Sequence, residues 1–122
     1  PLTFQLNSVI HHSFGAIEGV QAGEFNAVSG LDTPDYAGFQ ANIAKAAQSL
    51  ADLSVDDVNA LAGKDVMFKF GEMRMPFTAE GFLLSFSKPN LYFHATTAYD
   101  ILRMKGVPLG KRDFLGQLQL KG

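Results

Sequence analysis

The stretch PNLYFHATTAYD (Pro89–Asp100) places a proline directly before a helical pattern that carries one histidine, His94. At 100° per residue, one stripe of this helix consists of Asn90, His94, Thr97 and Ile101. The neighbouring stripe is apolar and consists of Leu91, Ala95, Ala98 and Leu102. His94 is therefore predicted to lie at the border of a helical core.

Proline and glycine set the limits of this helix. Pro89 has no backbone N–H and its ring clashes with the preceding turn, so we expect the helix to kink or restart near residues 87–89. Thr78 is the predicted cap at its start. Beyond the proline, the helix is predicted to run from Asn90 to Lys105 and to end at Gly106, followed by a loop-like tail.

The segment before this helix has the pattern of a β-hairpin. Apolar residues alternate with other residues from Val66 to Phe77, and the pair Gly71-Glu72 interrupts the pattern at its centre. A two-residue turn that begins with glycine joins antiparallel strands. Pro76 cannot donate a ladder hydrogen bond, so the second strand is predicted at an edge or an end of a sheet.

The N-terminal half is predicted to be helical. A nearly all-round apolar pattern predicts one buried helix over residues 2–20, and it begins at Pro1 without a polar lead-in, as though a further segment preceded it. A loop is then predicted at Gly23, Asn26, Ser29 and Gly30. Thr33 and Pro34 predict the start of a helix that reaches Leu53. Ser54 and Asp57 predict a capping box before a short helix that ends at Gly63.

Composition limits the classes of function. The chain has 122 residues, suited to one domain, and its net charge of −2 lacks the basic excess of nucleic-acid-binding proteins. No apolar run reaches the ~20 residues of a membrane-spanning helix. Cysteine is absent, which excludes disulfides and thiolate chemistry and fits a cytoplasmic location.

Histidines are the main chemical signal. Two facing helices of a bundle could bring His12, Asn90 and His94 together around a divalent metal with an open water position. Asn90 is a poor third ligand, because catalytic zinc sites use three histidines or two histidines and a carboxylate. The alternative is that His94 is a border residue hydrogen-bonded to a neighbour. On the first helix His12 lies at the edge of the main apolar stripe and His11 lies almost opposite that stripe, so His12 is predicted to be the inward partner. Tyr99 is either a core aromatic residue or a proton donor.

Three segments carry a family resemblance: PNLYFHATTAYDILRMKGVPLGKRDFLG (Pro89–Gly116), PLTFQLNSVIHHSFGAIEGV (Pro1–Val20) and FKFGEMRMPFTAEGFLLSFSKPN (Phe68–Asn90). They resemble a bacterial family catalogued as domain of unknown function nineteen ninety-three. The resemblance implies a DinB-like up-down four-helix bundle, mainly α with a small β-hairpin before the last helix. It also implies that residues 1–122 form a single domain that lacks the family's first helix, so that a long apolar groove needs a cover.

The wider DinB-like superfamily often binds a divalent metal, such as zinc or nickel, through one histidine on the second helix and an H-x-x-x-H pair on the last. By this resemblance His94 matches the second histidine of the pair and Asn90 stands at the first position. His12, or less well His11, matches the ligand of the second helix. Several members of the superfamily are metal-dependent thiol transferases or isomerases.

Two functions follow. One is a non-catalytic helical module, a homodimer whose pocket binds a small ligand or is vestigial. The other is a metal-assisted transferase or hydrolase with His12 and His94 as ligands, Asn90 as a weak ligand and Tyr99 as proton donor. The first is favoured because the ligand count of a catalytic metal site is not met.

Overall fold

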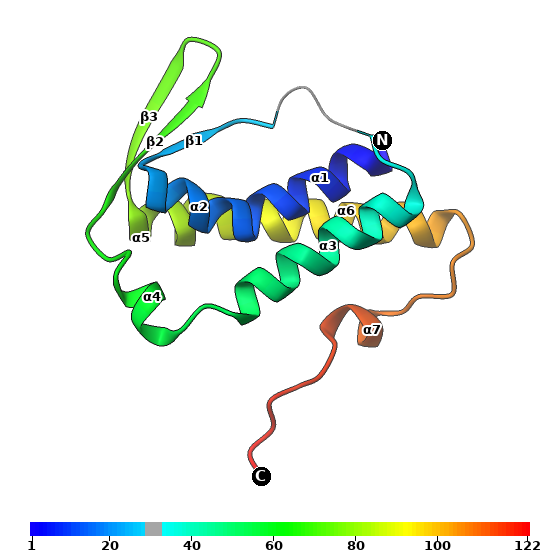
Figure 1. Cartoon of the computed structure of the whole chain (residues 1–122). Helices are drawn as coiled ribbons and strands as arrows, with labels where there is room; N and C mark the ends of the chain where they lie inside the picture. The colour runs from blue at the N-terminus through cyan, green and yellow to red at the C-terminus, as the bar shows by residue number, and fades with distance from the viewer. Residues whose placement is uncertain (29–32) are drawn as a thin grey trace.

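A computed structural model describes residues 1–28 and 33–122. Three long helical segments dominate it, and a small sheet lies at one end (Figure 1). The first segment consists of α1 (Leu2–His12) and α2 (Phe14–Ala22), and the second is α3 (Tyr36–Ala51). The third consists of α5 (Ala79–Gly81), the π-helical η1 (Phe82–Ser87) and α6 (Lys88–Met104). Short helices α4 (Val55–Asn59) and α7 (Lys111–Leu115) lie in the connection after α3 and in the C-terminal tail.

The N-terminal helix is broken where the sequence predicted one continuous helix. Ser13 leaves helical geometry, with ψ at −104°, and its hydroxyl donates to the carbonyl of Ile10 at 2.9 Å. A serine that hydrogen-bonds to backbone within its own turn competes with the helical ladder. The break makes His12 the last residue of α1.

The predicted hairpin is confirmed. Strand β2 (Asp65–Phe70) pairs antiparallel with β3 (Met73–Thr78), and Gly71 takes the positive φ of +55° at the first turn position. β3 is an edge strand, as Pro76 predicted.

A third strand, β1 (Glu24–Asn26), pairs parallel with β2 in a segment that was predicted to be a loop. That prediction was wrong for these residues because Phe25 buries its ring in the core, at 2 % exposure, and the backbone on either side bonds to β2. Ser29 and Gly30 lie outside the described residues.

Helix caps match the sequence in two of three places. Ser54 and Asp57 form the predicted capping box of α4, and the Thr78 hydroxyl accepts from the backbone N–H of Gly81 at 3.1 Å. The predicted start of α3 at Thr33 and Pro34 was wrong. Asp35 is the cap, because its carboxylate accepts from the backbone N–H of Gly38 at 2.8 Å and satisfies a donor that the helix leaves open.

The last helix was predicted to kink or restart near residues 87–89, but it passes through Pro89 without stopping. The irregularity lies earlier, where the six residues of η1 before α6 wind as a π-helix. A π turn lets the chain accommodate the missing N–H and the bulk of the proline ring. The tail was predicted as a loop, but it contains α7, and the backbone N–H of its cap residue Gly110 donates to the Asp113 carboxylate at 2.8 Å.

The core lies where α2, η1 and the sheet meet. Phe82 is fully buried at its centre, among Ala16, Val20, Phe25, Leu61, Val66 and Ala79. α1 packs along α6, while α3 packs on α1 and α2. The apolar stripe of α3 is only half covered: Phe39 and Ala46 are buried, but Ile43 and Leu50 keep 39 % and 37 % exposure.

Candidate functional site

The contact between α1 and α6 brings His12 and His94 together. Their imidazole rings are nearly parallel, at 10°, with centroids 6.1 Å apart. His12 is buried and His94 is half-buried, as the sequence predicted for an inward and a border residue. Of the three predicted site residues, His12 and His94 therefore meet across the interface between α1 and α6.

Each of these imidazoles is anchored through Nδ1. The Ser87 hydroxyl donates to the carbonyl of His12 at 3.1 Å, so its oxygen accepts from Nδ1–H of His12 at 3.2 Å. Nδ1–H of His94 donates to the side-chain carbonyl oxygen of Gln5 at 2.7 Å. Both rings therefore keep their lone pair on Nε2, the form in which an imidazole can accept a proton or a metal.

Burial keeps both rings neutral. Desolvation, followed by the charges of His11 and His94, lowers the pKa of His12 to about 4. Desolvation also lowers the pKa of His94. A neutral histidine pair at physiological pH is consistent with lone pairs available on Nε2.

The third predicted residue, Asn90, is tied to its own helix. Its Nδ2 donates to the carbonyl of Phe86 at 2.8 Å, in the π turn. Among the described residues, no three side chains of histidine, cysteine, aspartate or glutamate lie where they could hold a metal together. Two imidazoles and an amide oxygen fall short of the donor set of a catalytic zinc site.

Tyr99 lies away from this pair. It follows His94 by five residues, about 140° around the helix. Its hydroxyl donates to the carbonyl of Gly110, and its ring packs edge-on against Phe114 with centroids 5.4 Å apart. The structure thus engages the candidate proton donor in holding the C-terminal tail on α6.

Sequence reasoning missed the residues that orient the histidines. Gln5 lies about two helical turns before His12 on α1, and Ser87 lies directly before Lys88-Pro89. No spacing rule pairs Gln5 with His94, 89 residues away, because the pairing depends on how α1 crosses α6.

A cleft of about 610 Å³ lies on another side of α1, between the α1–α2 segment and α3. It was not predicted. α1 and α2 contribute Asn7, Ile10, His11, Phe14, Gly15 and Glu18, the strand end contributes Asn26, Ala27 and Val28, and α3 contributes Asn42, Lys45, Ala46 and Ser49. The lining of the cleft therefore combines apolar side chains with polar and charged groups, and it includes His11 rather than His12.

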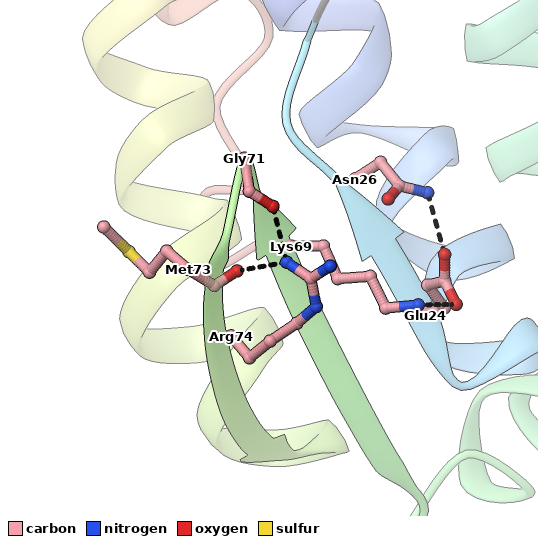
Figure 2. A network of polar contacts seen from close by, with 6 residues as sticks. All are labelled: Glu24, Asn26, Lys69, Gly71, Met73 and Arg74. Carbon is pink, nitrogen blue, oxygen red and sulfur yellow. Dashed lines mark hydrogen bonds and ion pairs between the residues drawn. The ribbon is translucent and has the colours of Figure 1, made fainter.

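The sheet supports one wall of this cleft. Figure 2 shows the ion pair that joins the β1 residue Glu24 to the β2 residue Lys69, with 2.5 Å between Nζ and Oε2, and the bond from the Asn26 amide to Glu24. At the hairpin turn, the Arg74 guanidinium donates to the carbonyls of Gly71 and Met73. The ion pair between Glu24 and Lys69 holds β1 on the hairpin, and β1 carries Phe25 and Asn26 to His11.

Comparison with known proteins agrees with the helical fold. The chain superposes on a crystal structure of a DinB family member protein from Shewanella denitrificans with a TM-score of 0.75 and 26 % identity. The match covers 100 % of this chain and 68 % of that chain. The protein is thus a mainly helical protein of the DinB-like type.

The family model "Domain of unknown function (DUF1993)" matches residues 1–115. The chain belongs to the DUF1993 family, as the three resembling segments indicated. No curated protein matches the sequence. In the part of the chain that the structure describes, no helix has the length and apolarity to cross a membrane.

Proposed function

We propose that this protein is a non-catalytic helical module that binds a small ligand in the cleft between the α1–α2 segment and α3. The volume of that cleft, about 610 Å³, carries the proposal. Small-molecule sites typically occupy roughly 300–1,000 Å³, with an apolar lining and a few polar groups that fix orientation. Ile10, Phe14 and Ala46 supply the apolar part, and His11, Lys45 and Asn42 supply the polar groups.

A blocked cleft tests this function. Ser49 lines the cleft from α3, whereas Ala44 lies on the same helix and is exposed outside it. Small aromatic carboxylates are titrated into the protein, and amide NMR shifts identify the residues they perturb. We expect the shifts to gather on the cleft residues, to vanish in Ser49→Phe and to persist in the matched control Ala44→Phe. Shifts that gather elsewhere, or that survive the block, would contradict the proposal.

We further propose that the module is a homodimer and that the partner supplies cover for the open side of α3, in the position of a fourth bundle helix. The support is the outer stripe of α3, where Tyr36, Ile43 and Leu50 recur every seven residues and keep 78 %, 39 % and 37 % exposure. Seven-residue spacing of apolar side chains is typical of helices that pack on another helix.

Light scattering tests the dimer. The expected mass is twice the 13.2 kDa of the chain. Ile43→Glu places a charge in the stripe and should yield monomer, while Ala44→Glu, one residue away, should remain dimeric. A wild-type monomer at micromolar concentration would remove this part of the proposal.

The second candidate function is a divalent-metal-dependent transferase or hydrolase that uses His12, Asn90 and His94. One observation favours it. Both imidazoles are hydrogen-bonded through Nδ1–H, so Nε2 carries the lone pair, as in histidines that bind metals. It stands second because the described residues 1–28 and 33–122 offer no third strong ligand beside this pair. Added zinc that raises the unfolding midpoint of the wild type, and not of His94→Ala, would reverse this order.

A further inference from the structure

Two contacts hold His11 in the wall of the cleft. Its Nε2 lies 2.7 Å from the carbonyl oxygen of Asn26, and its ring stacks on Phe25 with centroids 4.1 Å apart and planes at 27°. A carbonyl oxygen can only accept, so Nε2 carries the proton of the neutral ring. The lone pair of His11 is therefore on Nδ1, the opposite choice to His12 and His94.

Gly15 leaves this nitrogen uncovered. A Cβ atom added at Gly15 would lie 3.3 Å from Nδ1 of His11, and both residues line the cleft. Gly15 is in α2 and is not among the glycines with positive φ, so the backbone does not require glycine there. Alanine is the better helix former. The consequence of glycine at this position is thus space beside an imidazole lone pair.

The other groups of the cleft indicate what fits beside that lone pair. Lys45 is the cationic side chain in the lining and attracts a carboxylate, while Glu18 disfavours a second negative charge. Ile10 and Phe14 offer apolar surface between them. A group that donates a hydrogen bond is needed at Nδ1, because a neutral imidazole nitrogen without its proton accepts.

We propose that the cleft recognises a small aromatic or aliphatic monocarboxylic acid that also bears an N–H or O–H donor, with the donor on His11 Nδ1 and the carboxylate near Lys45. This inference rests on the proposed function of the cleft and names its ligand class. Gly15 is a specificity-determining residue in this arrangement, since its missing side chain gives the donor access to Nδ1.

Two matched probes test the hydrogen bond without any change to the protein. Indoleacetate carries a carboxylate, an apolar ring and an N–H donor, and its N-methyl derivative lacks only the donor. Wild-type protein should bind indoleacetate more tightly than the N-methyl derivative, by roughly fivefold, the contribution of one neutral hydrogen bond. Equal affinity for both probes, with shifts in the cleft, would overturn the ligand class and leave the proposed function standing. If neither probe shifts the amide NMR signals of the cleft residues, the inference is overturned. The proposed function is then decided by the separate titration of the wild type and Ser49→Phe with other small aromatic carboxylates.

Variants locate the effect at Nδ1. Gly15→Ala should fold, since it improves helix propensity and requires the His11 ring to move by only a few tenths of an ångström. It should abolish the preference for indoleacetate, and circular dichroism melting checks the fold. In a double-mutant cycle, Gly15→Ala should have no further effect on that preference in the His11→Ala background. A preference that survives in Gly15→Ala or in His11→Ala would refute the assignment.

The carboxylate contact has its own pair of variants. Lys45→Gln should weaken the binding of both probes alike, because both carry the carboxylate. Lys64→Gln, an exposed lysine outside the cleft lining, should leave both affinities unchanged. Equal weakening by the two variants would indicate a nonspecific charge effect and would remove Lys45 from the site.

Discussion

Acidification should destabilise this protein through His12 well before its carboxylates titrate. The pKa of His12 is about 4 in the folded chain against 6.5 for an unperturbed histidine, mainly because burial disfavours the charged ring. The unfolded chain therefore binds more protons than the folded chain between these values, and stability rises with pH in that interval. The contribution of His12 is complete above about pH 6.5 and is lost as the pH falls through about 4.

The magnitude follows from the two pKa values. Between about pH 7.5 and about pH 5, linkage gives a loss of about 2 kcal/mol in the free energy of unfolding. His94, whose pKa is also lowered by burial, adds to the loss in the same direction. The pKa values of Glu24, Asp57 and Glu80 are lowered by hydrogen bonds, so these carboxylates stay charged in this window and contribute little to its slope.

Urea unfolding at both pH values measures the effect. His12→Gln removes the buried imidazole and should abolish most of the pH-dependent loss of about 2 kcal/mol. This expectation concerns the difference between the two pH values and does not depend on the stability of the variant at neutral pH. His11→Gln is the control one residue earlier, and it should keep most of the loss, because burial lowers the pKa of His12 more than the charge of His11 does. A wild-type difference below about 0.5 kcal/mol, or an unchanged slope in His12→Gln, would refute the burial argument.

Three further predictions concern the fold. Phe82→Ala should cost about 3–5 kcal/mol in urea unfolding because the ring is fully buried, whereas Phe93→Ala, at a ring that is 65 % exposed, should cost far less. Ser54→Ala removes the capping hydroxyl of α4 and should lower stability by about 1 kcal/mol, as measured by thermal melting. Gly71→Ala puts a side chain at a φ of +55° and should cost about 1 kcal/mol by the same measurement, while an unchanged midpoint would argue against that turn geometry.

Local signals in the sequence predicted several elements where one residue type has a specific backbone role, although the start of α3 was predicted two residues too early. Gly71 marked the hairpin turn, Pro76 the edge strand, and Ser54 with Asp57 the capping box, and all are confirmed. The predictions failed where a tertiary contact decides. Three residues around Phe25 have no strand signal of their own, and they pair because the hairpin offers its free edge and the core accepts the ring.

The candidate site shows the same division. Helical spacing placed His94 at the border of the core and His12 on the inward side of α1, and the structure agrees. Spacing could not show that Gln5 and Ser87 orient these rings, since both partners come from the other helix. It also could not show that His11, predicted to point away, forms part of a cleft, because α3 and β1 create that wall only after folding.

The sequence by itself determined the family, the helical class, the hairpin and the absence of cysteine chemistry, because these depend on residue identity and on short periodic patterns. Only the tertiary structure decided which nitrogen of each histidine carries the proton and which space each ring faces. Those properties depend on single hydrogen bonds between segments up to 89 residues apart, from Gln5 to His94, and on the crossing of α1, α3 and α6 that brings the segments within reach.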